Sequence, residues 1–248
     1  MYIVCKRAHS NSIDGQIYEE LKREIIMITR FKRISMVCVL GWRFFRVFLQ
    51  IIYGAWRISK LAHPIITIFG SSKIAPSEKY VHEANQIASW LVDYDMSVLT
   101  GGGPGIMQAA NLGAMHQIKN DEIRSIGIGV RGLYENKNMY VQEYFALDYF
   151  FARKWLLTQY SSGFIIFPGG FGTLDELSEI LTLIQTNQMK KVPIVLIGKD
   201  FWDPFMQWLT QKAVPHGLIT AEHLKLFSVT DDPYKAFCFV RGQCKIDE

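Results

Sequence analysis

The sequence predicts an α/β fold, a doubly wound parallel sheet with helices on both faces, preceded by an N-terminal amphipathic helical extension. Two observations carry this prediction. From His63 onward, short apolar runs alternate with segments of helical periodicity that are ten or more residues long. The runs are apolar at consecutive positions, which is typical of parallel strands that are covered on both faces. The 248 residues suffice for one large domain of this kind with an appendage.

The alternation can be followed element by element to the end of the chain. The first strand is PIITIFG at 64–70, and the first helix follows over 77–95, where a serine and then a glutamate open the apolar period. Further strands are expected at 96–100, 125–130, 139–147, 163–167, 192–198 and 224–230. Further helices are expected at 105–119, 148–162, 173–185, 202–214 and 232–240.

The N-terminal part differs in composition, and we divide the chain into an extension at residues 1–60 and a domain at residues 61–248. The stretch 34–56 has the apolar character of a membrane span, but Arg43 and Arg46 would be costly at the centre of a bilayer. Its polar side chains fall on one side of a helical wheel. The stretch therefore predicts a basic amphipathic helix.

Two roles for this helix remain open from the sequence. In the first, the helix packs on the body of the protein or on a second subunit. In the second, residues 34–58 associate weakly with an anionic membrane surface. The polar, mixed residues 1–30 are expected to be poorly ordered or peripheral.

Composition limits the classes of function. The formal charge of +4 is mild and its basic residues concentrate in the first sixty positions, so nothing indicates nucleic-acid binding. The four scattered cysteines form no CxxC pair, which is typical of reduced thiols in a cytoplasmic protein. The six histidines form no HxxxH or HExxH pattern, so we predict no metal site.

Glycine-rich loops follow three of the predicted strands: Gly70-Ser71, Gly101 to Gly103, and Gly169 to Gly172. Parallel sheets bind ligands beyond the carboxyl ends of their strands, so these loops mark the expected site. Helices begin directly after the second and third loops, and a helix N-terminus attracts phosphate. The alternative is that the glycines only make tight turns. Three consecutive glycines exceed what a turn needs, which favours an anion site.

A literal G-x-G-x-x-G pattern at Gly127, Gly129 and Gly132 does not mark a dinucleotide site. The pattern lies within and just beyond a predicted strand, whereas a dinucleotide fingerprint opens a helix. The chain also contains no GxxxxGK[ST] stretch, which disfavours a P-loop nucleotide hydrolase. A mononucleotide with one phosphate fits the loops better.

Charged residues accompany the third loop. Thr173-Leu174-Asp175-Glu176 matches the pattern of a capping box, so Glu176 could cap the helix, face the cleft, or do both. Upstream, Arg153-Lys154 interrupts an apolar helix just before the strand that leads to this loop. A surface pair and a cleft-facing Arg153 are equally compatible with this spacing.

The motif GGGPGIM, the pair Arg153-Lys154 and the motif PGGFGTLDE together resemble the LONELY GUY (LOG) family of nucleoside 5′-monophosphate phosphoribohydrolases, whose mark is P-G-G-x-G-T-x-x-E. The resemblance extends roughly from Pro64 to Phe237 and is nearest to the bacterial long-form branch. It implies a Rossmann-like homodimer that cleaves the N-glycosidic bond of AMP or of a cytokinin riboside 5′-monophosphate. The products are the free base and ribose 5-phosphate, and no cofactor is needed.

Such proteins are often labelled lysine decarboxylases, but the sequence shows no recognisable pyridoxal-phosphate lysine motif. It also departs from the M-H-x-R-K pattern of shorter plant-type members, because Phe150 and Phe151 stand where that pattern has methionine and histidine. A role for cytokinin therefore need not follow, and a general AMP nucleosidase fits equally well. The alternative to an enzyme is a Rossmann-like protein that carries a nucleotide or cofactor without hydrolysing it.

The resemblance implies that Arg153 and Glu176 are the catalytic pair. Breaking an N-glycosidic bond builds positive charge on the ribose. A carboxylate can stabilise this charge, activate a water molecule, or do both in turn. An arginine can hydrogen-bond to the leaving base or fix the nucleotide. With the glycine loops, the expected substrate contacts are Gly70, Ser71, Gly101, Gly102, Gly103, Glu135, Lys154, Gly169, Gly170, Phe171, Gly172, Thr173, Leu174, Asp175 and Thr182.

Overall fold

The computed structural model describes residues 13–75, 77–116, 123–133 and 137–242, with side chains from residue 18 onward. Contacts divide the chain into two units, which meet between Leu49 and Gln50. The first unit consists of most of the long helix α1. The second unit contains the sheet and the remaining helices.

The second unit is built on a parallel sheet of seven strands in the order β4-β3-β2-β1-β5-β6-β7. The chain enters at the central strand β1, runs outward to β4, and then returns to β5 on the other side of β1. This reversal confirms the predicted doubly wound α/β fold. The strands are β1 (Ile65–Phe69), β2 (Ser97–Thr100), β3 (Ser125–Val130), β4 (Glu143–Leu147), β5 (Gly163–Ile166), β6 (Ile194–Ile197) and β7 (Ser228–Thr230).

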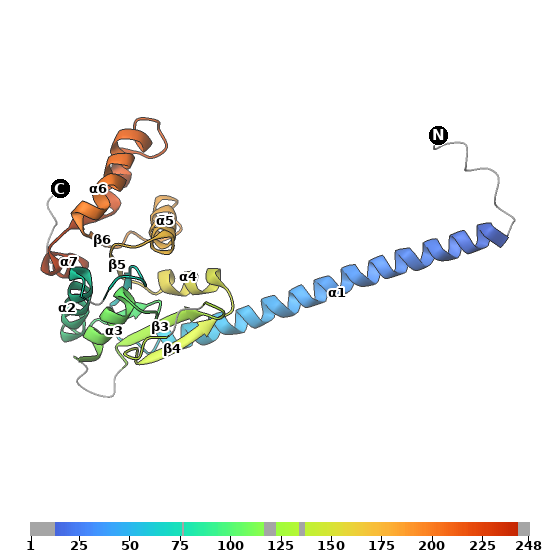
Figure 1. The fold of residues 1–248 in the computed structure, drawn as a ribbon, viewed down its shortest axis with the longest axis horizontal. Coiled ribbons are helices and arrows are strands. Elements are labelled where there is room, and N and C mark those ends of the chain that lie inside the picture. The colour runs from blue at the N-terminus through green and yellow to red at the C-terminus, as the bar shows by residue number, and fades with distance from the viewer. Residues whose placement is uncertain (1–12, 76, 117–122, 134–136, 243–248) are drawn as a thin grey trace. The chain divides into compact units, whose positions relative to one another are not determined.

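Helices cover the sheet and follow the predicted alternation (Figure 1). The helices α2, α3 and α7 pack together, and their apolar side chains form one core cluster with those of the central strands. Figure 1 shows α4 and α5 apart from that group. The bounds are α2 (Lys79–Asp93), α3 (Ile106–His116), α4 (Phe150–Gln159), α5 (Phe171–Gln185), α6 (Lys199–Trp208) and α7 (Pro233–Val240), with shorter helical turns η2 (Leu209–Ala213) and η3 (Ala221–Leu226).

The last strand is shorter than predicted. The apolar run at 224–230 forms a strand only over β7, because η3 occupies its first residues. The Thr220 side chain and His223 satisfy each other's backbone N–H groups at the start of η3. This local cap favours a helical turn where the apolar pattern alone predicted a strand.

Helix α1 (Ile13–Ile58) is 46 residues long and begins far upstream of the predicted start at residue 34. Residues 13–30, which we expected to be poorly ordered or peripheral, are therefore helical. Its last turns belong to the second unit, where Ile58 is fully buried and Gln50 Nε2 donates to Asp148 Oδ2 at 2.7 Å. Among the described residues, α1 is the one helix long and apolar enough to cross a membrane by length and composition.

Candidate functional site

The three predicted glycine loops meet at the carboxyl edge of the sheet. Ser71, which follows β1, donates its backbone N–H to the carbonyl of Pro168 at 3.0 Å. Its own carbonyl accepts from the N–H of Ile106, the first residue of α3, at 3.1 Å. The loops after β1, β2 and β5 are thus joined by backbone hydrogen bonds. The structure therefore brings together segments that lie up to a hundred residues apart in the sequence.

Arg153 lies against the second loop. A Cβ atom at Gly101 would collide with Arg153 Nη2 and would lie 2.7 Å from the sulfur of Met107. Glycine at position 101 is what allows the guanidinium of α4 to approach the end of β2. Arg153 Nε is buried and has no hydrogen-bond partner among the described residues. Arg153 and Lys154 are both half-buried, so they do not form an exposed surface pair.

A buried polar network, which the sequence analysis missed, holds the second loop from behind. Asn111 on α3 is fully buried and accepts from Thr100 Oγ1 at 2.9 Å. Asn138 donates from Nδ2 to Asn111 Oδ1 and to the carbonyl of Gly103, both at 3.0 Å. The N–H of Gly102 donates to Thr100 Oγ1 at 3.0 Å. An asparagine in the middle of the mostly apolar helix IMQAANLGAM was the available signal.

The third loop leads into α5, which starts earlier than the motif suggested. Gly170 is the N-cap residue, and its carbonyl accepts from the N–H groups of Thr173 and Leu174, both at 3.0 Å. The proposed capping box is therefore wrong, because Thr173 already lies inside the helix and no side chain caps it. Thr173 instead packs over Gly169, where a Cβ would lie 2.6 Å from the Thr173 Cβ.

The outer face of the third loop is open. A Cβ atom at Gly170 or at Gly172 would meet nothing within 4 Å. Phe171 between them is 91% exposed. The start of α5 also carries unpaired backbone N–H groups and the positive end of the helix dipole. These features leave room for an anionic ligand at this end of the helix.

Glu176 stands one turn further along α5 and is the most perturbed acid of the site. Its side chain is 6% exposed, and its Oε2 atom is buried without a hydrogen-bond partner among the described residues. Burial raises the pKa of Glu176 to about 7, although the positive charges of Arg153 and Lys154 act to lower it. A carboxyl group with this pKa can hold or release a proton near neutral pH.

Lys154 joins α4 to α5 through two ion pairs. Its Nζ lies 3.0 Å from Asp175 Oδ2 and 2.5 Å from Glu179 Oε2. Burial alone would lower the pKa of Lys154, but the hydrogen bonds to Glu179 and Asp175 outweigh it and raise that pKa. The lysine is thus held in its charged form between the two acids. Glu179 is a second residue that the sequence analysis missed.

The remaining expected contacts lie at different depths. Gly70 lies beneath the side chain of Ile106, and a Cβ atom at position 70 would be 2.7 Å from Ile106 Cγ2. Leu174 is half-buried. Thr182 is exposed and its hydroxyl donates to the carbonyl of Ser178 at 2.7 Å. It lies six residues beyond Glu176, about 9 Å along the helix axis. Glu135 lies outside the described residues.

The arrangement combines a buried carboxyl group and a half-buried guanidinium with an open glycine loop. Glu176 Oε2 and Arg153 Nε are both buried and unpartnered within the described part of the chain, although unpaired buried polar atoms are costly. A ligand that bonds to both atoms would remove this cost. Within the described residues, no group of three or more His, Cys, Asp and Glu side chains could hold a metal ion.

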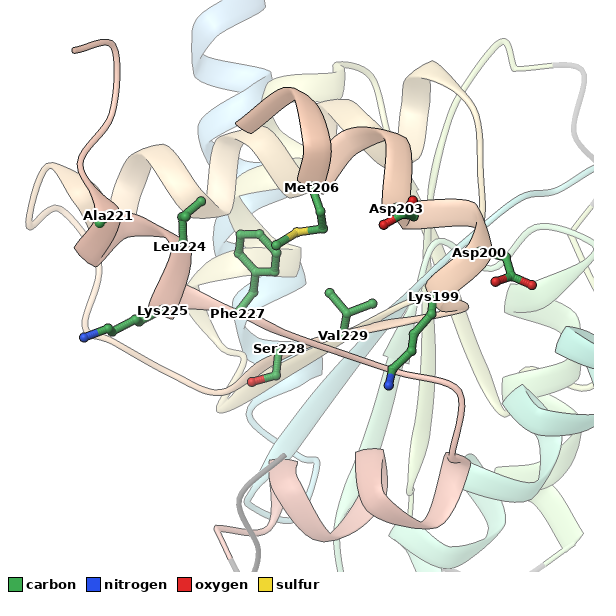
Figure 2. Close-up of a pocket in the computed structure, with 10 residues that line it drawn as sticks. All are labelled: Lys199, Asp200, Asp203, Met206, Ala221, Leu224, Lys225, Phe227, Ser228 and Val229. Atoms are coloured by element: carbon green, nitrogen blue, oxygen red, sulfur yellow. The ribbon is translucent and has the colours of Figure 1, made fainter. Parts of the chain in front are cut away.

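A cavity of about 730 Å³ lies elsewhere, between α6, η3 and β7. Figure 2 shows Met206 and Phe227 facing each other across it, with Lys199 on its lower side. None of the predicted site residues that the structure describes lines this cavity. Arg153 and Glu176, whose Nε and Oε2 atoms are buried without hydrogen-bond partners among the described residues, do not line it.

Comparison with known proteins gives a consistent family assignment. The model of a family described as "possible lysine decarboxylase" matches residues 107–238, more than half of the chain. The chain is 29% identical over 161 residues to the cytokinin riboside 5′-monophosphate phosphoribohydrolase LOG of Oryza sativa, a match that covers 63% of this chain and 64% of the relative. It is 31% identical over 166 residues to the probable phosphoribohydrolase LOG6 of Arabidopsis thaliana, a match that covers 64% of this chain and 79% of the relative.

Solved structures with the same fold include proteins of a different kind. The molybdenum cofactor carrier protein of Chlamydomonas reinhardtii is similar with a TM-score of 0.53 at 22% identity, over 73% of this chain and 98% of that one. The molybdenum cofactor binding protein of Rippkaea orientalis has a TM-score of 0.52 at 21% identity, over 72% and 96%. These similarities confirm the Rossmann-like fold.

Proposed function

The chain belongs to the LOG family, and from that premise we propose that it hydrolyses the N-glycosidic bond of a nucleoside 5′-monophosphate. The products are the free base and ribose 5-phosphate. The observation that carries the proposal is Glu176, a buried carboxyl group with a pKa of about 7 and an unpartnered oxygen, under the positive charge of Arg153, whose Nε atom is also buried.

The two residues divide the chemistry. As the bond between ribose and base breaks, positive charge develops on the ribose ring, and the ionised Glu176 stabilises it. The same carboxylate accepts a proton from the water that attacks the anomeric carbon, and a proton passes on to the departing base, which leaves as the neutral free base. Arg153 donates hydrogen bonds to the departing base or to the ribose hydroxyls and so fixes the bond that breaks.

The 5′-phosphate is expected at the start of α5. Gly170 and Gly172 leave open space there, and the helix end offers N–H groups to an anion. The exposed ring of Phe171 provides an apolar surface on which a base can stack. Binding of the phosphate would orient the glycosidic bond toward Glu176, so that remote binding energy assists the reaction.

We propose AMP or a cytokinin riboside 5′-monophosphate as the substrate type; the second is in line with the names of the two plant relatives. The decarboxylase in the family's description suits the site less well. A Schiff base requires a neutral lysine amine, whereas Asp175 and Glu179 hold Lys154 in its charged form. A homodimer and a cytoplasmic location stay predictions; the subunit mass in solution tests the first.

The test is an incubation of the purified protein with AMP, GMP, CMP and isopentenyladenosine 5′-monophosphate. We expect release of free base and ribose 5-phosphate from at least one of them. Glu176→Gln should lower kcat by about 100-fold or more, because glutamine cannot act as a base. Glu222→Gln, an exposed acid in an ion pair on η3, is the matched control and should keep wild-type activity.

Two results would contradict the proposal. Wild-type rates in Glu176→Gln would remove the catalytic role of this carboxylate. Tight binding of a nucleotide, with no base released from any member of the panel, would instead support a carrier without hydrolytic activity.

A further inference from the structure

We propose that the α1 segment Ile25–Leu49 binds to an anionic membrane surface and that the protein is peripherally attached there. The inference goes beyond the hydrolytic reaction and does not depend on it. It rests on three properties of this segment: its exposed apolar side chains, the sign of its charges, and its length.

The segment exposes large apolar side chains along its whole length. Phe31 is 73% exposed, Trp42 is 62% exposed and Phe48 is 57% exposed. Only 6% of the most apolar window of α1 is buried. Soluble monomers rarely expose a continuous apolar surface of this kind, so it marks an interaction site. The same surface includes Ile25, Ile26, Met27, Ile28, Ile34, Met36, Val37, Val39, Leu40, Phe44, Phe45 and Leu49.

The charges of the segment select the partner. Between Ile25 and Leu49 there are five basic residues and no acidic residue. Two copies of the segment lying along each other would bring like charges together without an acid to pair with them. An anionic lipid surface supplies the opposite charge and an apolar layer at the same time. The basic residues are Arg30, Lys32, Arg33, Arg43 and Arg46.

The distribution of these charges favours a helix that lies on the membrane over one that crosses it. An arginine or lysine is costly at the centre of a bilayer, and the basic residues occur in both halves of the segment. In the interfacial region the long basic side chains can reach the headgroups while their stems follow the apolar layer. Trp42 is also of the residue type that is enriched at the interface.

The first experiment is vesicle flotation with the full chain. One set of vesicles consists of phosphatidylcholine alone, and the other contains about one-third phosphatidylglycerol to supply negative charge. We expect the protein to float with the anionic vesicles, to float far less with the neutral ones, and to be released as salt is raised.

A pair of charge-reversed variants provides the sharper test. Lys32→Glu with Arg33→Glu should weaken partition into the anionic vesicles by about 30-fold or more. Lys190→Glu with Lys191→Glu is the matched control, because it also replaces two neighbouring exposed bases and lowers the formal charge of +4 by the same amount. The control should partition like the wild-type protein.

The proposal also predicts a local change at Cys38, which is exposed on α1. An environment-sensitive fluorophore attached there should shift to shorter wavelength when anionic vesicles are added. Equal loss of binding in both charge-reversed variants would show a non-specific effect of net charge and overturn the proposal. Folded protein that floats with neither vesicle would also overturn it, and self-association lost in Lys32→Glu with Arg33→Glu would then identify a second copy as the partner.

Discussion

The two long glycine loops of this protein look alike in sequence and differ in what surrounds them. In the loop after β2, Gly101 lies under the guanidinium of Arg153, and Gly102 lies against the ring of Tyr144 with a φ of +70°. In the loop after β5, a Cβ at Gly170 or Gly172 would meet nothing within 4 Å. The first loop therefore uses glycine to pack, and the second uses it to leave space.

This difference assigns separate tasks to two similar motifs. We expected the three consecutive glycines at 101–103 to signal an anion site, because they exceed the need of a turn. The contacts now account for the first two by the approach of Arg153 and Tyr144. The open loop at the start of α5 is the stronger candidate for the phosphate.

The largest effect is expected at Glu176, on the helix that follows the open loop, and it concerns the free energy of unfolding. Its pKa is about 7 when folded and 4.5 in the reference state, so between these pH values the folded protein binds more protons than the unfolded chain. The contribution of this group to the free energy of unfolding is fully present below about pH 4.5. It is lost as pH rises to about 7, and the loss reaches about 3 kcal/mol.

Urea unfolding of the wild-type protein and of Glu176→Gln measures this loss. The free energy of unfolding of the wild-type protein should fall relative to that of the variant across the window from about pH 4.5 to about 7. A constant difference across the window would show that the carboxyl group is hydrated in solution.

The next largest effect is expected for Gly101→Ala in the packed loop. The added Cβ would displace Arg153, whose Nη2 occupies that space. A displacement of about 1 Å at a catalytic group can cost about 100-fold, so kcat/KM for the nucleotide should fall by that order. Steady-state kinetics measures kcat/KM, and thermal unfolding checks that the variant is folded. Unchanged kinetics in a folded variant would show that the position of Arg153 does not matter for the reaction.

Gly102→Ala should act mainly on stability. Its φ of +70° is strained for alanine, and the new Cβ would lie 2.7 Å from the Tyr144 ring. We expect a loss of about 2 kcal/mol in the free energy of unfolding, measured in urea. A change below about 0.5 kcal/mol would mean that the packed loop relaxes freely.

The smallest effect is expected for Gly172→Ala in the open loop. Alanine meets no neighbour there and favours the helix, so stability should stay equal or rise by up to about 1 kcal/mol. The methyl group would project into the expected phosphate site, so KM should rise several-fold while kcat holds. An unchanged KM would place the nucleotide away from this loop.

Much of the fold was predictable because its signals are local. The apolar runs that became β1, β3 and β5 needed only their own composition and the turns around them. The order of strands around β1 was not visible in any single segment, because it depends on pairing between distant residues. The strand that became β7 was predicted too long, because a cap at Thr220 turns the first residues of the apolar run into η3.

The site was predictable to the level of motifs but not of contacts. The sequence analysis named Arg153 and Glu176, and each has a buried side-chain atom without a hydrogen-bond partner among the described residues. The approach of Arg153 to Gly101 could not be read from the sequence, since fifty-two residues separate them. The capping box failed because Gly170 ends the loop three residues before Thr173, so the textual match fell inside the helix.

The double ion pair of Lys154 has a consequence for recognition at the neighbouring residue. Successive side chains of a helix point about 100° apart, so a lysine anchored to both Asp175 and Glu179 sets the rotation of α4 about its axis. Arg153 is then oriented before any substrate arrives. The entropy of ordering this guanidinium is lost during folding, and binding of a nucleotide can begin from a preorganised site.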